Sequence, residues 1–190
     1  MNNLLNKITW GDSFELVKTI ENQSVDLVLT DMPYDLDEDQ KSILVEQSLR
    51  VSRGDVLIFC SPENQIKSPK YLFWVKPTST KNFSKSHGRF VEMIALFQRG
   101  KTFNQLFWAN MTGVYRDVLE GKPVHPYQKP MSLIERLINI HSNKGDIVLD
   151  LFAGSGTVCL GARNLGRNYI GIEQDLEYFT AATTRLYDNK

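Results

Sequence analysis

The sequence predicts an α/β fold of the Rossmann-like type, in which helices cover both faces of a mostly parallel sheet. Short apolar runs rich in β-branched residues alternate with segments of helical periodicity along most of the 190 residues. The apolar runs are continuous, which is typical of strands buried on both faces. A glycine-rich turn joins one such run to a helix, as at the ligand-binding edge of open α/β sheets. We therefore expect one domain with about seven strands.

The first half of the chain alternates strands with helices. Asp12 or Ser13 is a suitable N-cap for a segment with helical spacing. A second helix begins with acidic residues, which favour the helix dipole, and Gly54 is expected to stop it. Strands are predicted at residues 7–10, 24–30 and 55–60, and helices at residues 13–20 and 37–52.

The middle of the chain differs from its two ends. Two strand candidates are joined by the polar, basic connection at residues 78–89, and we expect them to pair as an antiparallel hairpin at a sheet edge. Residues 101–126 have weak periodicity and are taken as irregular. Pro130 then lies near the first turn of a helix. Strands are predicted at residues 70–77, 90–98, 146–152 and 168–173, and helices at residues 129–142, 157–166 and 175–188.

Composition limits the classes of partner. The formal net charge is zero, so nucleic-acid binding requires a local patch. Residues 65–101 supply a candidate, with eight Lys or Arg and one acid, Glu92. Cys60 and Cys159 lie in apolar contexts without metal-ligand spacing, which is typical of reduced core residues. With no membrane-spanning run and no signal-peptide pattern, we expect a cytoplasmic protein without a metal site.

The turn "FAGSG" is the first candidate binding element. It follows a buried strand and opens a helix, so backbone N–H groups are free to bind a ligand there. The turn lacks the third glycine of the dinucleotide-binding pattern. Asp150, just before the turn, would repel a phosphate but suits a positive charge, and Glu173 ends the next strand, where an acid suits ribose hydroxyls. The ligand that fits both acids is S-adenosylmethionine.

The stretch "DMPY", residues Asp31 to Tyr34, is the candidate catalytic element. It follows the buried strand at residues 24–30, so it should lie beside the glycine turn at the same sheet edge. An exocyclic amino group on a base is a poor nucleophile, and two acceptors on its N–H bonds direct its lone pair at an electrophile. The Asp31 carboxylate and a backbone carbonyl held by Pro33 are such acceptors, and Tyr34 offers a stacking face.

These motifs resemble those of the amino-group DNA methyltransferases, in the permuted class whose catalytic half precedes the cofactor half. The family's D/N/S-P-P-Y/F/W motif stands here as "DMPY", its F-x-G-x-G as "FAGSG" and its HPTQKP segment as "HPYQKP". The resemblance implies a single methyltransferase domain with a catalytic half at residues 1–100, a short irregular recognition segment at 101–124 and a cofactor half at 125–190. Met32 departs from the pattern, but it keeps the required carbonyl group.

The resemblance also implies roles for individual residues. Asp31 with Met32, Pro33 and Tyr34 would handle the target amine, and an aspartate in first place favours adenine N6. Asp12 would contact the adenine of S-adenosylmethionine and Glu173 its ribose, while Lys129, at a helix N-terminus, would lie near its carboxylate. The remaining expected cofactor-binding residues are Asp150, Phe152, Ala153, Gly154, Ser155, Gly156 and Thr157.

Few residues of this chain are available for target recognition. Sequence-reading members of the family carry a long insert where about twenty-five irregular residues stand here, so we expect a short or relaxed DNA target, or recognition by a second subunit or a second copy of the chain. The expected phosphate contacts are Lys76, Lys81, Lys85 and Arg89. Core packing is expected for Phe107 and Trp108, a structural or surface place for His87 and His125, and an outward place on its strand for Glu92.

Three activities therefore remain open from the sequence. The first is an adenine-specific DNA methyltransferase, of the kind found in restriction-modification systems, acting on duplex DNA. The second is a non-catalytic, cofactor-binding scaffold subunit. Met32 and the small recognition segment permit it, but a scaffold needs none of Asp31, Tyr34 and Glu173. The third is the same chemistry on RNA or single-stranded DNA.

Overall fold

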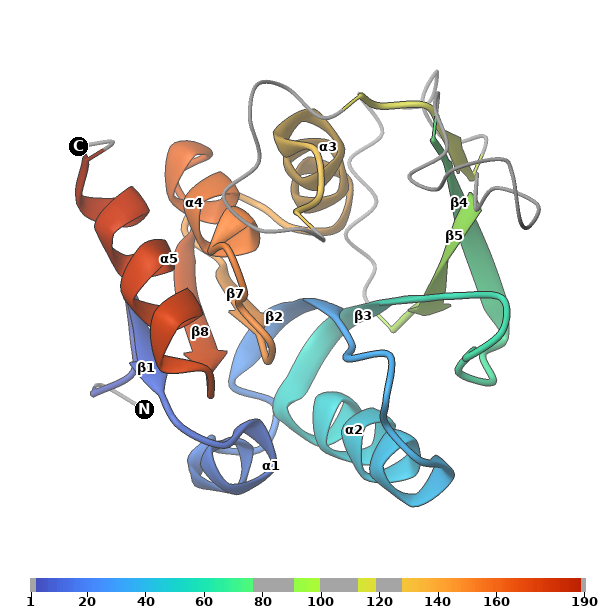
Figure 1. The fold of residues 1–190 in the computed structure, drawn as a ribbon, viewed down its shortest axis with the longest axis horizontal. Helices are drawn as coiled ribbons and strands as arrows, with labels where there is room; N and C mark the ends of the chain where they lie inside the picture. The colour runs from blue at the N-terminus through green and yellow to red at the C-terminus, as the bar shows by residue number, and fades with distance from the viewer. Residues whose placement is uncertain (1–2, 77–90, 100–112, 119–127, 189–190) are drawn as a thin grey trace.

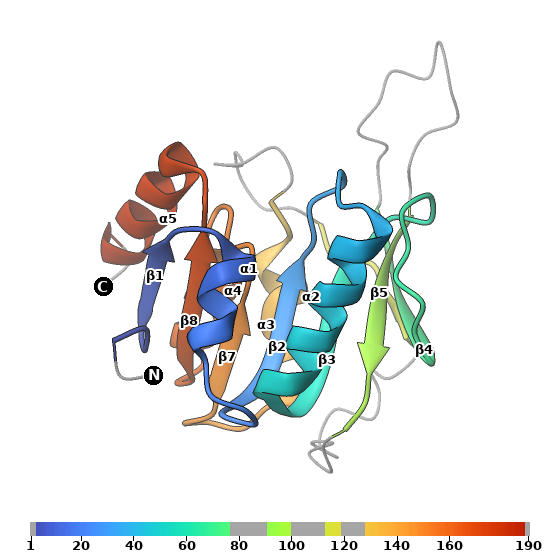
Figure 2. The same ribbon diagram turned by 90° about the horizontal axis from the view of Figure 1, so that it is seen from below.

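The computed structural model describes residues 3–76, 91–99, 113–118 and 128–188, and its strands form one mixed sheet (Figure 1). The strand order is β1-β8-β7-β2-β3-β5-β4-β6, and Figure 2 shows the strands from β1 to β4 side by side. β5 runs antiparallel to β3 and β4, and the other strand pairs are parallel. The strands are β1 (Lys7–Trp10), β2 (Val25–Asp31), β3 (Ser52–Cys60), β4 (Lys70–Val75), β5 (Val91–Phe97), β6 (Val114–Tyr115), β7 (Ile147–Asp150) and β8 (Asn168–Glu173).

Helices cover both faces of the sheet, which confirms the predicted fold class. α1 and α2 lie on one face, and α3, α4 and α5 lie on the other (Figures 1 and 2). The helices are α1 (Ser13–Leu16), which continues as a 3-10 turn (Val17–Thr19), α2 (Glu38–Val51), α3 (Met131–His141), α4 (Thr157–Asn164) and α5 (Leu176–Asp188). No helix in the described ranges is long and apolar enough to cross a membrane.

β2 is buried on both faces, as its uniform apolar sequence predicts. Leu27 and Leu29 belong to the core beneath α3 and α4, whereas Val28 belongs to the core beneath α2, and all three side chains have no exposed surface. Cys60 and Cys159 are free and buried, in agreement with their expected place in the core. The strand that carries the DMPY motif is therefore held rigidly from both sides.

Gly54 does not stop α2, contrary to expectation. The helix ends at Val51, and Gly54 is the third residue of β3. A Cβ at this position would lie 1.9 Å from the carbonyl oxygen of Asp26, and the pairing of β2 with β3 is irregular at this point. The glycine therefore permits close approach of two strands at a bulge rather than ending a helix.

The predicted hairpin exists as β4 and β5, but it does not form the sheet edge. β5 lies between β3 and β4, and the edge is the two-residue strand β6, which pairs with β4 through Phe73 and Trp74. β6 falls in the segment predicted to be irregular, and it raises the number of strands from the expected seven to eight. Two residues are too few to show a strand period in the sequence.

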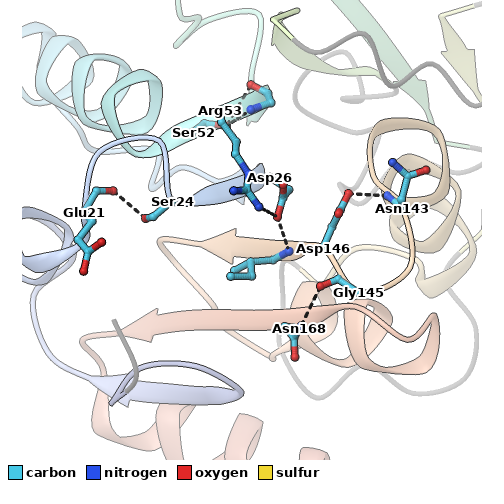
Figure 3. Close-up of polar contacts among 11 residues, drawn as sticks. Glu21, Ser24, Asp26, Ser52, Arg53, Asn143, Gly145, Asp146 and Asn168 are labelled. Carbon is cyan, nitrogen blue, oxygen red and sulfur yellow. Dashed lines mark hydrogen bonds and ion pairs between the residues drawn. The ribbon is translucent and has the colours of Figure 1, made fainter.

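Polar side chains join the strands at the amino-terminal edge of the sheet (Figure 3). Asp26, near the start of β2, forms two hydrogen bonds with the guanidinium of Arg53 and accepts a third, 2.9 Å long, from the backbone N–H of Ile147. Asn168 donates to the carbonyl of Gly145. These bonds fix β2, β3, β7 and β8 relative to one another, and so fix the opposite ends of the same strands.

Candidate active site

A cavity of about 460 Å³ opens at the carboxyl edge of the sheet. The complete DMPY motif lines it, together with Asp35 from the same loop. The glycine turn after β7, the end of β8, the residues before α3 and side chains of α3, α4 and α5 supply the rest of its wall. Segments more than a hundred residues apart in the sequence therefore meet at this edge, as the sequence predicts.

Asp31 is the last residue of β2, and its carboxylate faces a buried ammonium group. Lys129 donates a hydrogen bond to Oδ2 of Asp31, and the Lys129 side chain is 6% exposed. Burial raises the pKa of Asp31, the Lys129 ammonium offsets part of this rise, and the charge of Glu92 adds to it. The result is a carboxyl group that stays protonated to a higher pH than a free aspartate.

The next three residues of the motif have different environments. Met32 is 2% exposed and packs in the core beneath α2, and its N–H donates to the carbonyl of Phe59 over 3.3 Å. Tyr34 is only partly buried, and its carbonyl accepts a hydrogen bond from the side chain of Asn64. Met32 thus anchors the loop to the core, while Pro33 and Tyr34 line the cavity.

The glycine turn is open toward the cavity, and Glu173 fixes its backbone by a hydrogen bond. Gly154 and Gly156 both have left-handed backbone conformations, with φ of 50° and 72°. A Cβ at Gly154 would meet only the carbonyl oxygen of Phe152, 4.0 Å away. Glu173 accepts hydrogen bonds from the N–H groups of Gly154 and Asp175, one on each carboxylate oxygen. The turn and the acid that ends β8 therefore form one rigid unit.

Asp150 connects the two halves of the site. It is the last residue of β7, and Oδ1 accepts hydrogen bonds from the hydroxyl of Thr30 and from the N–H of Phe152. Thr30 directly precedes Asp31, so this bond fixes the DMPY motif against the glycine turn. Burial raises the pKa of Asp150 to about 7, against the two hydrogen bonds, and the charges of Asp31 and Glu173 contribute to the rise.

Comparison with known proteins gives the family of the chain. Residues 51–184, more than half of the chain, match the N6/N4 methyltransferase family model, which is described as DNA methylase. The chain belongs to this DNA methylase family. It is similar to the type II methyltransferases M.HinfI of Haemophilus influenzae and M.HpaI of Haemophilus parainfluenzae. The identity is 26% in both cases, over 100% and 95% of this chain and 70% and 74% of the two relatives.

Solved structures agree with this assignment. The crystal structure of an M1.HpyAVI–SAM complex has a TM-score of 0.75 and 31% sequence identity, and the match covers 94% of this chain and 98% of that one. The cytosine-N4-specific PvuII DNA methyltransferase has a TM-score of 0.74 over 95% of this chain and 89% of its own. Because its sequence identity is 16%, it supports the fold alone.

One acidic residue of this DNA methylase, Glu92, has partners that the sequence did not reveal. Glu92 was expected to point outward, but it is 6% exposed and forms ion pairs with Lys129, at 3.1 Å, and with Lys76. The signal that could have found it is the hairpin register, which places Glu92 opposite Trp74 and hence beside Lys76. Since β5 is antiparallel, its second residue lies at the carboxyl edge of the parallel strands.

Two lysines also have other neighbours than expected. Lys129 was predicted to lie near the cofactor carboxylate, yet its ammonium group is paired with Asp31 and Glu92. Lys76 was predicted to contact DNA phosphates, yet its side chain is 15% exposed, pairs with Glu92 and lies over the Trp74 ring. The other predicted phosphate contacts, Lys81, Lys85 and Arg89, lie outside the described residues, as do Phe107, Trp108, His87 and His125.

The other predicted cofactor residues differ in their relation to the cavity. Phe152, Ala153, Ser155 and Thr157 line it, whereas Asp12 is the N-cap of α1 and accepts from the N–H of Phe14. Arg185 of α5 was missed by the sequence reasoning, and it donates to the Ser155 carbonyl and the Thr157 hydroxyl. Among the described residues, no group of three or more His, Cys, Asp or Glu side chains is arranged to hold a metal ion.

Proposed function

We propose that this DNA methylase transfers a methyl group from S-adenosylmethionine to the exocyclic N6 amino group of adenine in DNA. The observation that carries the proposal is the joint cavity of the DMPY motif and the glycine turn, fixed by the hydrogen bond between Thr30 and Asp150. The aspartate in the first motif position favours adenine over cytosine. Because Asp31 precedes the glycine turn in the chain, the permuted class is the one that the motif order supports.

The residues of the cofactor half fit S-adenosylmethionine. The open side of Gly154 leaves room for a ligand against the turn. Glu173 presents two fixed carboxylate oxygens, which suits a ribose with two hydroxyl groups. Asp150 is a buried acid whose ionised form suits a ligand with an ammonium and a sulfonium group. The bound cofactor supplies the electrophilic methyl carbon, and these side chains supply its position.

In the catalytic half, Asp31 acts on the target amine. Its carboxylate accepts one N–H hydrogen bond of the amine, and a backbone carbonyl of the DMPY loop accepts the other, which directs the nitrogen lone pair outward. Tyr34, partly buried on the cavity wall, stacks on the base that has been taken out of the helix. Positioning and electrostatic stabilisation account for the rate, and no strong base is required.

We also propose that target recognition is reduced in this chain. The alignment to M.HinfI covers all 190 residues but extends over 253 positions, so that relative carries segments without a counterpart here. Direct base readout needs several side chains delivered to a groove by an ordered element. The chain therefore has a short or relaxed target, or it uses a second copy or a separate subunit for recognition.

Methyl transfer from labelled S-adenosylmethionine to duplex DNA, single-stranded DNA and RNA tests the function. We expect label in duplex DNA, recovered as N6-methyladenine after digestion to nucleosides. Asp31→Ala should abolish transfer while cofactor binding persists. Asp26→Ala, a matched change at the other end of the same strand, should retain transfer.

Each other outcome contradicts a stated part of the proposal. Cofactor binding without transfer to any substrate would support the scaffold function instead. Label recovered as N4-methylcytosine would refute the adenine assignment, and transfer confined to RNA or single-stranded DNA would refute the duplex substrate. Transfer that survives Asp31→Ala would refute the catalytic role of this residue.

A further inference from the structure

Four charged side chains form an alternating row that ends at the catalytic carboxylate. Asp31 contacts Lys129, Lys129 contacts Glu92, and Glu92 contacts Lys76. They come from the end of β2, the segment before α3, the start of β5 and the residue after β4. From Asp31 to Lys76 their side chains are 27%, 6%, 8% and 15% exposed. The row is therefore shielded from water except at its Asp31 end.

The fold alone does not account for this arrangement. Removing ionised groups from water is unfavourable, and apolar side chains of similar volume often stabilise a core equally well. Lys129 and Asp31 would neutralise each other as a simple pair. Glu92 adds a second buried negative charge beside them, and this charge needs Lys76 in turn. An extra buried charge next to a catalytic group indicates a role in the reaction.

We propose that Glu92 is a positioning residue for methyl transfer, on the basis of the function proposed above. Glu92 holds the Lys129 ammonium against Oδ2 of Asp31, so that Oδ1 is the oxygen presented to the target amine. It also takes part of the hydrogen bonding of Lys129, which leaves the Asp31 carboxylate a stronger acceptor than it would be in an isolated ion pair. Lys76 completes the row and keeps Glu92 ionised.

The charges in the site agree with this division of roles. Burial alone would raise the pKa of Glu92, but the ammonium groups of Lys129 and Lys76 outweigh burial and lower it. Burial opposes the charged form of Lys129, yet the charges of Asp31 and Glu92 raise its pKa. Glu92 and Lys129 therefore keep fixed, opposite charges over the pH range in which Asp31 titrates.

Several other groups surround Asp31, and the test must hold them constant. The charged and titratable groups that face it are Lys129, Glu92, Lys76, Tyr34, Asp150 on β7 and Cys60 on β3. A substitution of Glu92 or Lys129 leaves Asp150 and Cys60 in place. The difference in the acid limb between the two variants therefore depends on the charges of the row alone. The absolute position of the acid limb depends on all of these groups.

The decisive experiment is the pH profile of single-turnover methyl transfer for Glu92→Gln and Lys129→Gln. Glu92→Gln removes a negative neighbour, so Asp31 ionises more easily and the acid limb of the profile moves to lower pH. Lys129→Gln removes a positive neighbour, so the acid limb moves to higher pH. We expect shifts of about one pH unit in opposite directions. By analogy with other supporting residues, the maximal rate should fall roughly 10- to 100-fold in both variants.

Two further variants separate positioning from folding. Glu92→Asp keeps the charge but withdraws it from Lys129, so the rate should fall while the acid limb stays near its wild-type position. Asp117→Asn is the matched control, because it makes the same acid-to-amide change at a buried carboxylate whose ion-pair partner is Arg136 and not a member of the row. It should leave the acid limb unmoved. Thermal unfolding of every variant verifies that it is folded.

The outcomes distinguish this inference from the function on which it rests. A wild-type chain that methylates no substrate refutes the proposed function itself. A wild-type chain that is active and is inactivated by Asp31→Ala supports the function. If Glu92→Gln and Lys129→Gln then leave the acid limb in place or move it in the same direction, the positioning role of Glu92 is wrong. A fully active Glu92→Asp would also overturn that role.

Discussion

β2 carries an aspartate near each end, and the two residues have opposite environments. Asp26, at the amino edge of the sheet, binds the guanidinium of Arg53 at 2.6 Å and 3.0 Å, and Arg53 is 56% exposed (Figure 3). The same carboxylate accepts from the N–H of Ile147. Asp31, at the carboxyl edge, is paired with the buried Lys129 and lines a cavity.

The comparison indicates that the amino end of β2 contributes to stability, whereas its carboxyl end has the environment of a functional site. At the amino edge the carboxylate is bound by a backbone donor and a flexible, solvated cation, so its charge is satisfied at little cost. At the carboxyl edge Asp31 and Asp150 are buried, and burial raises the pKa of both. Acids in such an environment are unfavourable for folding, and they are typical of functional sites.

Asp31→Asn should have the largest effect on activity. The substitution keeps the shape of the side chain but removes the charge that, in the proposed function, accepts from the amine. We therefore expect the rate of methyl transfer to fall about 10²- to 10³-fold, or about 3–4 kcal/mol. The Tm should shift by less than about 4 °C, because the loss of one buried ion pair is offset by the removal of a desolvated charge. Single-turnover kinetics and thermal unfolding measure the two effects. A large loss of Tm with an unchanged rate would reverse the comparison.

Asp26→Ala should give the opposite pattern. The change leaves the N–H of Ile147 without its carboxylate partner and removes the bidentate contact of Arg53, so we expect a loss of about 1–3 kcal/mol in the free energy of unfolding. Denaturant titration measures this loss. The rate of methyl transfer should remain within about twofold, which is below 1 kcal/mol. A rate that falls in parallel with stability would show that the amino edge also determines the geometry of the site.

Asp150 should make cofactor affinity depend on pH. With a pKa of about 7 before binding, Asp150 must lose a proton to face a cation, so binding of S-adenosylmethionine releases a proton below pH 7. We expect the Kd to fall about tenfold, or about 1.4 kcal/mol, for each unit of pH increase up to about 7 and then to level off. Calorimetric titration at several pH values measures this slope. Asp150→Asn should abolish it, and a slope that persists in this variant would assign the proton to another group.

The sequence predicted those site residues whose position follows from the end of a single strand. Asp31, Asp150 and Glu173 each end a buried apolar run, and parallel strands bring such ends to the same edge. The roles of these residues remain proposals, but their proximity follows from local pattern and sheet topology alone. Gly154 belongs to the same group, because a glycine after a strand and before a helix indicates a tight turn.

Contacts that depend on strand register could not be predicted in this way. Glu92 stands in an apolar run and meets Lys76 only because β5 returns antiparallel to β4 in one particular register. Lys129 contacts Asp31 of β2 and Glu92 of β5 from the segment before α3, which pairs with neither of these strands. Gly54 shows a different limit, since glycine both ends helices and permits close strand contacts, and its neighbours in sequence do not distinguish the two uses.

Met32→Pro should have the smallest effect on the rate of methyl transfer. It tests how strongly residue 32 determines the position of Asp31. Proline would restore the family's usual residue and restrict the backbone next to Asp31, which favours the reaction by about 1 kcal/mol at most. However, Met32 is buried, and its N–H donates to Phe59, so proline also removes a hydrogen bond and core contacts. We expect a rate within about fivefold of wild type and a lower Tm. A loss of more than about tenfold in a folded variant would show that the side chain of Met32, and not only its carbonyl, holds Asp31 in place.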